Sequence, residues 1–234
     1  METIHGLCPK CSLSLIEARS SSINDLTAAV DTAVARGASV ISNSYGGPEF
    51  AMETTLDEHY NRRGVTIVVS SGDSGYGTTY PAAAPTVVAV GGTSLQLRGG
   101  QRISETAWLG AGSGCSQYVA KPAWQHDSRC PRRSIADVAA DADPLTGAAI
   151  YASYGHSGRG WMTLGGTSLA APIISGLLAS GHNSSNLPSR FYDTSAVGNL
   201  RDIAVGNNGR CRSYFCLARN GYDGPTGLGV LFGW

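Results

Sequence analysis

The sequence has little charge and no long apolar run. Only 15% of its 234 residues are charged, and 17 basic residues balance 17 acidic ones, so the net charge is zero. A neutral chain gives no electrostatic reason to expect a nucleic acid or an anionic membrane as partner. No apolar run reaches the ~18 residues that span a bilayer, and we therefore expect no transmembrane helix and no membrane partner.

We also expect no secretory signal peptide at the start of this sequence. Residues 1–5 lead directly into a segment with two cysteines, which we expect to be a strand, without the basic, apolar and small-residue regions of such a leader. We interpret Met1 as an internal point of a longer chain or as a start site placed too late. The length fits one large domain, and no repeat, linker or low-complexity tract divides residues 1–234.

Cysteine is scarce but paired, since six residues form three close pairs. The even number and the local pairing favour disulfides and an oxidising compartment. A zinc site at the first Cys-x-x-Cys is the alternative, but a structural site needs a second pair of that spacing, which the sequence lacks. A glycosylation sequon at residues 183–185 is compatible with secretion. The three pairs are Cys8/Cys11, Cys115/Cys130 and Cys211/Cys216.

Strands and helices alternate over the first ~90 residues. Ser22 and Asp25 resemble a capping box at the start of a helix that ends at Gly37. Such alternation with short connections predicts right-handed βαβ units, hence an α/β fold with a parallel sheet flanked by helices. The expected strands are residues 12–18, 39–44, 65–69 and 86–90, and the second expected helix is residues 51–63.

The remainder of the chain is richer in glycine and polar residues. We expect residues 110–160 to lie in long surface loops and residues 167–180 to form a helix of small residues. The tail, residues 202–234, is expected to be loop with little regular structure.

One motif carries a candidate nucleophile. Residues 165–172 read Gly-Gly-Thr-Ser-Leu-Ala-Ala-Pro, which places Ser168 at the start of a helix. There a hydroxyl is exposed at the positive end of the helix dipole, and backbone N–H groups can help to hold an oxyanion. The alternative is a serine that only caps the helix. The string is similar to the nucleophile motif of the subtilisin clan.

A second motif follows the expected strand 65–69. Residues 70–75 read Ser-Ser-Gly-Asp-Ser-Gly and put Asp73 at the carboxyl end of a parallel strand, where α/β sites form. An aspartate in a glycine turn is the alternative. A histidine-based triad is not expected, because none of the five histidines lies in the His-Gly-Thr-His context of subtilisins.

With these motifs, and with similar stretches at residues 8–11, 42–47, 89–94 and 137–144, the chain resembles the sedolisin (serine-carboxyl peptidase) family of the subtilisin clan. The resemblance implies a subtilisin-like three-layer α/β fold, with a parallel sheet flanked by helices and a C-terminal calcium loop. It also implies a serine-type endopeptidase or tripeptidyl-peptidase with polypeptide substrates.

The resemblance also implies roles for single residues. Ser168 is the nucleophile, and Asp73 replaces the oxyanion asparagine of subtilisins. An aspartic acid donates a hydrogen bond only when protonated, so activity is expected at acid pH. Ser44, Tyr45 and Gly46 line the substrate cleft, where an extended peptide pairs with backbone.

The tail resembles the calcium loop of the same family. The resemblance implies one Ca²⁺ ion held by the side chains of Asp202 and Asp223 and by the carbonyls of Ile203, Arg219 and Gly221. Two carboxylates with several carbonyls suit a hard cation that needs about six oxygen ligands. Two surface aspartates in loops are the alternative.

The resemblance breaks at the general base. Family members use a Glu and an Asp one helical turn apart, just upstream of the Cys-Pro-x-Cys segment. Aligned on Cys8, this Asp falls immediately before Met1 and the Glu four residues earlier. We do not expect Glu2, Glu17 or Asp25 to substitute, and so we expect this chain alone to be inactive or very weak.

Two other functions stay open. A non-catalytic, peptide-binding pseudo-peptidase would keep the cleft and the calcium loop. A lipase-like hydrolase needs a Gly-x-Ser-x-Gly elbow, and residues 166–170 lack the second glycine. The peptidase interpretation implies a secreted, monomeric protein.

Overall fold

A seven-stranded sheet forms the centre of the protein. The computed structural model describes residues 1–154, 159–181, 188–193 and 199–231, so the sequon at residues 183–185 lies outside the described residues. The sheet has the order β1-β3-β5-β9-β13-β12, with β6 paired to β5. The first five of these strands run parallel, while β12 and β6 pair antiparallel with their neighbours. The strands are β1 (Val40–Asn43), β3 (Thr66–Ser70), β5 (Val88–Arg98), β6 (Gln101–Ala107), β9 (Val138–Asp141), β12 (Leu200–Arg201) and β13 (Val230–Leu231).

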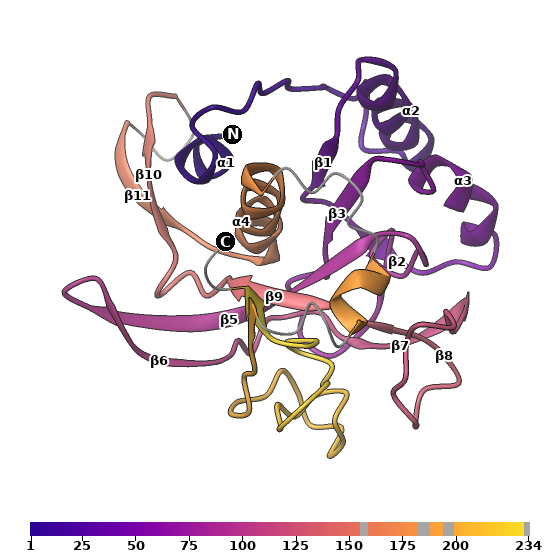
Figure 1. Ribbon diagram of the computed structural model, residues 1–234, viewed down its shortest axis with the longest axis vertical. Helices are drawn as coiled ribbons and strands as arrows, with labels where there is room; N and C mark the ends of the chain where they lie inside the picture. The colour runs from indigo at the N-terminus through magenta and orange to yellow at the C-terminus, as the bar shows by residue number, and fades with distance from the viewer. Residues whose placement is uncertain (155–158, 182–187, 194–198, 232–234) are drawn as a thin grey trace.

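Helices cover both faces of this sheet (Figure 1). Alternate side chains of β3 point to opposite faces: Ile67 and Val69 pack with Val30 of α2 (Ile23–Ala35), while Val68 packs with Ile174 of α4 (Thr167–Ser180). All five residues of β3 are buried, as its β-branched sequence predicts for a strand covered on both sides. The expected three-layer α/β fold, a largely parallel sheet flanked by helices, is confirmed.

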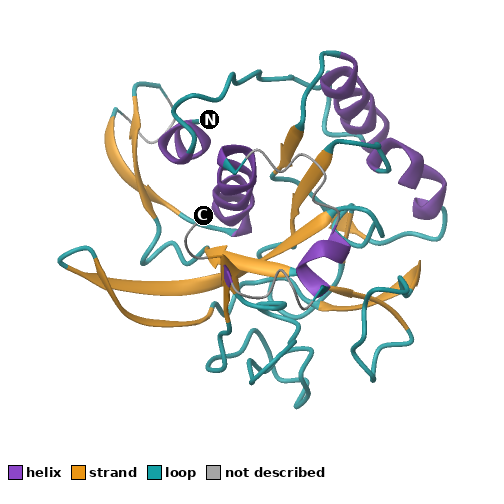
Figure 2. Ribbon diagram, in the orientation of Figure 1, coloured by secondary structure: helices purple, strands orange, loops and turns teal. Residues whose placement is uncertain are grey.

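Smaller elements surround the three layers (Figure 2). On the α4 side lies α1 (Glu2–Leu7), and on the α2 side lies α3 (Asp57–Tyr60), preceded by the 3-10 turn η1 (Glu53–Leu56); a second 3-10 turn is η2 (Pro188–Tyr192). None of the helices in the described residues is both long and apolar enough to cross a bilayer. Three antiparallel pairs are separate from the sheet: β2 (Gly47–Pro48) with β4 (Thr79–Tyr80), β7 (Gly114–Ala120) with β8 (Arg132–Ile135), and β10 (Ala148–Ala152) with β11 (Gly160–Leu164).

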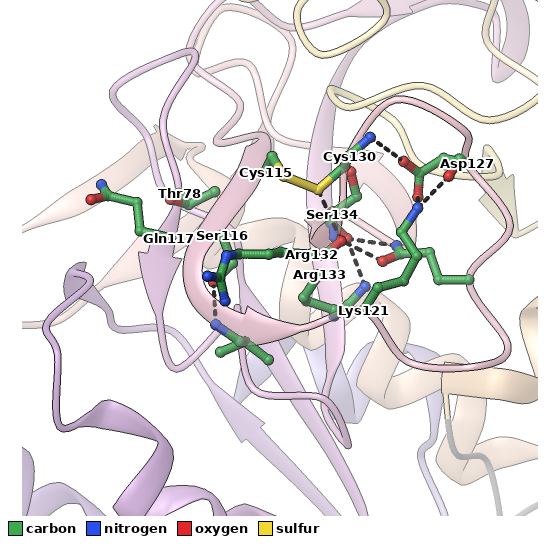
Figure 3. The surroundings of a disulfide bond; sticks show 12 residues. Thr78, Cys115, Ser116, Gln117, Lys121, Asp127, Cys130, Arg132, Arg133 and Ser134 are labelled. Carbon is green, nitrogen blue, oxygen red and sulfur yellow. Dashed lines mark hydrogen bonds and ion pairs between the residues drawn. A yellow bond between two sulfur atoms is a disulfide. The ribbon is translucent and has the colours of Figure 1, made fainter.

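Each close pair of cysteines forms a disulfide, which excludes the zinc interpretation of the first pair. Figure 3 shows how Cys115 of β7 is bonded to Cys130, just before β8. The loop between the two strands is ordered by Asp127, whose carboxylate accepts a hydrogen bond from the Cys130 N–H at 3.2 Å and pairs with the Lys121 ammonium at 3.1 Å. The disulfide and the ion pair therefore hold the loop to the strand pair.

Two predictions near the amino terminus are wrong. Residues 12–18 are extended but belong to no strand, although serine and leucine alternate there. Residues 2–7 form a helix rather than leading into a strand, because Ile4 and Leu7 pack against Gly176 of α4, which has no side chain to keep them away. Tertiary contact therefore decides the conformation of this short segment.

Two further predictions are corrected in part. The expected helix 51–63 is only the short η1 and α3, because Glu53 and Tyr60 turn into the core and the chain bends around them. Residues 110–160 are not all surface loops, since they contain β9, a central strand of the sheet. The small and acidic residues around β9 do not form the β-branched run that identifies a buried strand. In the structure, Val138 and Ala140 of β9 pack against α4, and their small side chains allow the helix to come close. The helix 167–180 is confirmed.

Candidate active site

Ser168 lies exposed in the first turn of α4, near the sheet edge where β3 ends. The chain enters this helix through Gly166, which has φ of 88° and donates its N–H to the Ala142 carbonyl at 2.5 Å. A Cβ on Gly166 would lie 2.6 Å from Asp73 Oδ2, so both the backbone conformation and the close approach require glycine. The Gly-Gly pair before the serine therefore sets the angle at which α4 starts.

Asp73 follows β3 and caps the same helix. Its Oδ1 accepts hydrogen bonds from the Thr167 N–H and from the Thr167 hydroxyl, both at 2.7 Å. The Gly72 N–H in turn donates to the Thr167 hydroxyl at 3.1 Å. These hydrogen bonds connect the loop with Asp73 to the start of α4 next to Ser168. They also place the Asp73 carboxylate at the positive end of the helix dipole.

The candidate substrate residues complete this arrangement. A cleft of about 520 Å³ is lined by Ser44, Tyr45, Gly46, Asp73 and Ser168, so the structure brings all five together. The Ser44 hydroxyl donates to the Ser168 carbonyl at 2.9 Å and ties the end of β1 to α4. The cleft is therefore bordered by backbone on one side and by the exposed serine on the other.

A set of neighbouring acids, Glu49, Glu53 and Asp57, of which Glu53 is fully buried, was missed by sequence reasoning. Glu49 accepts hydrogen bonds from the hydroxyls of Thr78 and Ser116 and from the Gln117 N–H, the last at 3.1 Å. Thr78 belongs to the same cleft-lining loop as Asp73. Glu49 therefore connects that loop to β7. No local sequence signal separates this glutamate from the exposed acids around it.

Glu53 lies close to Glu49 and is fully buried. Its Oε2 accepts a hydrogen bond from the Phe50 N–H at 2.9 Å, while Oε1 has no hydrogen-bond partner in the described residues. Burial, and then the neighbouring Glu49 carboxylate, raise the pKa of Glu53 to about 8. Burial also raises the pKa of Asp57, which accepts a hydrogen bond from the Tyr80 hydroxyl at 3.1 Å, to about 6. This region therefore holds protonated carboxyl groups at mildly acid pH.

No general base contacts Ser168 in the described residues: no hydrogen bond joins its hydroxyl to a carboxylate or an imidazole. Asp25 is held instead by Arg19 and Ser20 at the start of α2, and the Ser20 bond lowers its pKa. Glu17 is exposed on the extended segment, and Glu2 is exposed on α1. None of the three acids is placed as a base for the serine.

The candidate calcium residues meet at the carboxyl-terminal loop. Asp202 Oδ2 accepts a hydrogen bond from the Gly221 N–H at 2.7 Å, and Asp223 Oδ2 accepts one from the Arg219 N–H at 2.9 Å. Asp223 is fully buried; its burial, with a contribution from Asp202, raises its pKa to about 7. Ile203 is buried beside the sheet. The loop therefore brings two carboxylates near each other.

The donor set of this loop is small. The described residues contain no group of three or more acidic, histidine or cysteine side chains that could hold a metal ion. A cation here would take two carboxylates and otherwise backbone carbonyls, a set that hard cations such as Ca²⁺ accept. Within the described residues the carboxylate of the buried Asp223 accepts hydrogen bonds only from neutral donors, so a cation is a fitting further partner.

Comparison with known proteins is consistent with this geometry. The profile of the Subtilase family matches residues 1–188. Sedolisin from Pseudomonas sp. (strain 101) is 37% identical over 203 residues, which are 72% of this chain and 34% of that protein. Kumamolisin from Bacillus sp. (strain MN-32) is 31% identical over 233 residues, 83% of this chain and 41% of that protein. The chain thus spans about a third to two fifths of the length of these relatives.

Solved structures show the same likeness. Pseudomonas sedolisin, complexed with two molecules of pseudo-iodotyrostatin, superposes with a TM-score of 0.75 at 33% identity. The match covers 91% of this chain and 68% of that one. Sphericase superposes with a TM-score of 0.57 at 22% identity, over 92% of this chain and 65% of that one, and this shows a shared fold only.

Proposed function

Because this chain belongs to the subtilase family, in its sedolisin branch, we propose that it carries the nucleophile half of an acid-active serine-carboxyl peptidase. The observation that supports this proposal is the pair of hydrogen bonds from Thr167, at the start of α4, to the Asp73 carboxylate beside an exposed Ser168. An exposed serine hydroxyl at a helix start, with a carboxyl group beside it and a cleft in front, is suited to acyl transfer.

In the proposed reaction the Ser168 hydroxyl attacks a peptide carbonyl carbon, and a base takes its proton. The carbonyl oxygen becomes an oxyanion, to which protonated Asp73 donates a hydrogen bond together with backbone N–H groups. The amine leaves with a proton, and water then hydrolyses the acyl-enzyme. Since Asp73 has to be protonated to donate, the proposed activity belongs to acid pH.

The proposed substrate is an extended polypeptide that lies along residues 44–46. Gly46 is exposed and lines the cleft, and because it has no side chain its backbone stays accessible to a peptide. Backbone hydrogen bonds of this kind hold a peptide without regard to its sequence, so side-chain pockets set preference.

The base is the incomplete part of the proposed machinery. A serine without a base is a poor nucleophile, and the printed sequence lacks the Glu-x-x-x-Asp pattern that the resemblance implies upstream of Cys8. We therefore infer that this chain alone turns over peptides very weakly, with the rate that oxyanion and binding contributions leave behind.

The proposal extends to one Ca²⁺ ion and to the compartment. The side chains of Asp202 and Asp223 and the carbonyls of Ile203, Arg219 and Gly221 would hold the ion, whose charge would offset the two carboxylates and stabilise the loop. Three disulfides support secretion into an oxidising compartment. We propose a monomer that acts on polypeptides, with neither nucleic acid nor membrane as partner.

Intact-mass labelling with a serine-directed fluorophosphonate at about pH 4 and pH 7 tests the proposal. The protein is compared with a version extended at its amino terminus by the segment that precedes the matching position in Pseudomonas sedolisin, and with Ser168→Ala in both. Labelling of Ser168 that is strong in the extended form and weak in the other supports the proposal. Absence of labelling in both folded forms contradicts it.

A non-catalytic peptide-binding module is the second candidate. It is favoured by the missing partner of the Ser168 hydroxyl in the described residues. This function predicts that peptides bind the cleft with the same affinity in the Ser168→Ala variant, and that no fluorophosphonate adduct forms in the extended form.

A further inference from the structure

The sequence contains two Asn-Gly pairs, Asn208-Gly209 and Asn220-Gly221. In such a pair the main-chain nitrogen of the glycine can attack the side-chain amide of the asparagine, because glycine has no side chain to hinder the approach. Asparagine is therefore one of the thermolabile residues of proteins. The structure places the two pairs in very different surroundings.

Asn208 is held at both its side chain and its main chain. It is 2% exposed, and its Nδ2 donates to the Ala111 carbonyl and, at 2.6 Å, to the Ser113 hydroxyl. Its main-chain N–H donates to the Cys216 carbonyl at 3.0 Å. The side chain cannot turn toward the Gly209 nitrogen without breaking its two hydrogen bonds, so this pair is protected.

Asn220 lies in the tail loop, residues 202–229, which is drawn in gold and yellow in Figure 1. It is exposed and belongs to no helix or strand, and its side-chain amide has no hydrogen-bond partner in the part of the chain that the structure describes. Gly221 has φ of 78°, and a Cβ built on it would meet no atom within 4 Å. The Asn220 side chain is therefore free to turn toward the Gly221 nitrogen.

The Gly221 nitrogen is also in contact with a carboxylate. Its N–H donates to Asp202 Oδ2 at 2.7 Å. The N–H bond lies in the plane of the peptide unit, whereas the nitrogen attacks with electrons perpendicular to that plane, so the hydrogen bond leaves the attack open. A charged acceptor draws strongly on the proton. Asp202 therefore raises the electron density on the Gly221 nitrogen and makes it a better nucleophile.

We propose that Asn220 is a site of spontaneous deamidation, in which the Gly221 nitrogen displaces ammonia from the Asn220 side chain and the Asp202 carboxylate assists as acceptor of the Gly221 N–H. A bond forms between the Gly221 nitrogen and Asn220 Cγ, and the bond from Cγ to Nδ2 breaks. The Gly221 proton passes through solvent to the leaving nitrogen, which departs as ammonia. Water then opens the cyclic imide at either carbonyl and leaves aspartate or isoaspartate. The reaction consumes only water, and it does not depend on the proposed peptidase function.

The products change the tail loop. Both add a negative charge close to Asp202, and like charges repel. Isoaspartate also adds a methylene group to the main chain before Gly221. Both products therefore weaken the hydrogen bond that joins Gly221 to Asp202, and we expect the aged protein to melt at a lower temperature than the fresh protein.

Peptide mapping by mass spectrometry tests the proposal on folded protein aged at about pH 8 and about 37 °C with EDTA, which keeps cations away from the loop. We expect Asn220 to convert at least about tenfold faster than Asn208, because Asn208 reacts only when its surroundings open. In concentrated urea, where both pairs are unfolded, the two rates should become equal. Equal rates in the folded protein, or an intact Asn220 under conditions where Asn208 reacts in urea, overturn the proposal.

Two variants test the parts of the neighbouring groups. Asn220→Gln would need a larger ring to react, so it should stay unmodified and keep its melting temperature on ageing. Asp202→Asn keeps an acceptor for the Gly221 N–H but removes its charge, and we expect it to slow the conversion of Asn220 about threefold. A melting temperature that falls equally in the wild type and in Asn220→Gln, or an unchanged rate in Asp202→Asn, contradicts the proposal.

Discussion

Glu53→Gln isolates the effect of a buried carboxyl group on stability. Glu53 is fully buried, its Oε2 accepts a hydrogen bond from the Phe50 N–H, and Glu49 lies beside it. Glutamine keeps the acceptor for Phe50 and offers its amide N–H groups to the Glu49 carboxylate. It cannot ionise, so the variant removes the pH dependence of this position without changing its shape.

The direction follows from the pKa. Burial raises the pKa of Glu53 from 4.5 to about 8, so between these values the folded protein keeps a proton that the unfolded chain has released. Stability therefore falls as pH rises through this window, and the loss is absent below pH 4.5. Each pH unit above 4.5 lowers the free energy of unfolding by about 1.36 kcal/mol, so the loss at pH 7 is on the order of 3 kcal/mol.

Urea unfolding of both proteins at pH 4, 5.5 and 7 measures this effect. We expect equal free energies of unfolding at pH 4 and an advantage of about 3 kcal/mol for Glu53→Gln at pH 7. A smaller slope up to about pH 6 should persist in the variant, because burial also raises the pKa of Asp57. Glu58→Gln on the exposed side of α3 is the control and should follow the wild type. A variant curve parallel to the wild type would show that Glu53 is ionised in the folded protein and refute the reasoning.

Three further predictions concern the helix start, the core and the loop. Gly166→Ala should lower stability by about 1–3 kcal/mol more than Gly37→Ala, since both glycines have positive φ but only Gly166 would place its Cβ against Asp73; equal losses in urea unfolding would contradict this. Asp137→Asn should cost about 3–5 kcal/mol, because it leaves the fully buried Arg133 guanidinium unpaired; a loss below about 1 kcal/mol would contradict it. EDTA should lower the melting temperature and Ca²⁺ should restore it, with no response in the variant Asp202→Asn; an unchanged melting curve would remove the calcium proposal.

Much of the fold is readable from local pattern. The β-branched run at residues 65–69 predicts a strand covered on both faces, because only that environment suits continuous apolar side chains, and β3 has it. Ser22 predicts the start of α2, and its hydroxyl does accept a hydrogen bond from the Asp25 N–H at 3.3 Å. Short-range rules suffice here because the capping bond and the side-chain periodicity lie within a few residues.

Other elements depend on residues far away in the chain. Residues 12–15 alternate as a strand should, but a strand needs a neighbour to take its backbone hydrogen bonds, and the space beside them is a cleft. The helix at residues 2–7 exists because α4 presents Gly176 to it. The burial of Glu53 could not be predicted from the sequence either, because acidic residues are usually exposed and its buried environment is formed by other segments.

For the candidate site, the sequence by itself determined which residues are candidates for the chemistry. The glycine-flanked Ser168 and Asp73 are recognisable because small residues and turns are needed wherever backbone comes close to a reacting group. Only the tertiary structure decided that Asp73 bonds to Thr167, that Ser44 reaches the Ser168 carbonyl, and that Glu49 holds the Thr78 loop. These contacts join segments more than 25 residues apart in the chain, and their energies depend on distances of a few tenths of an ångström, which no local pattern specifies.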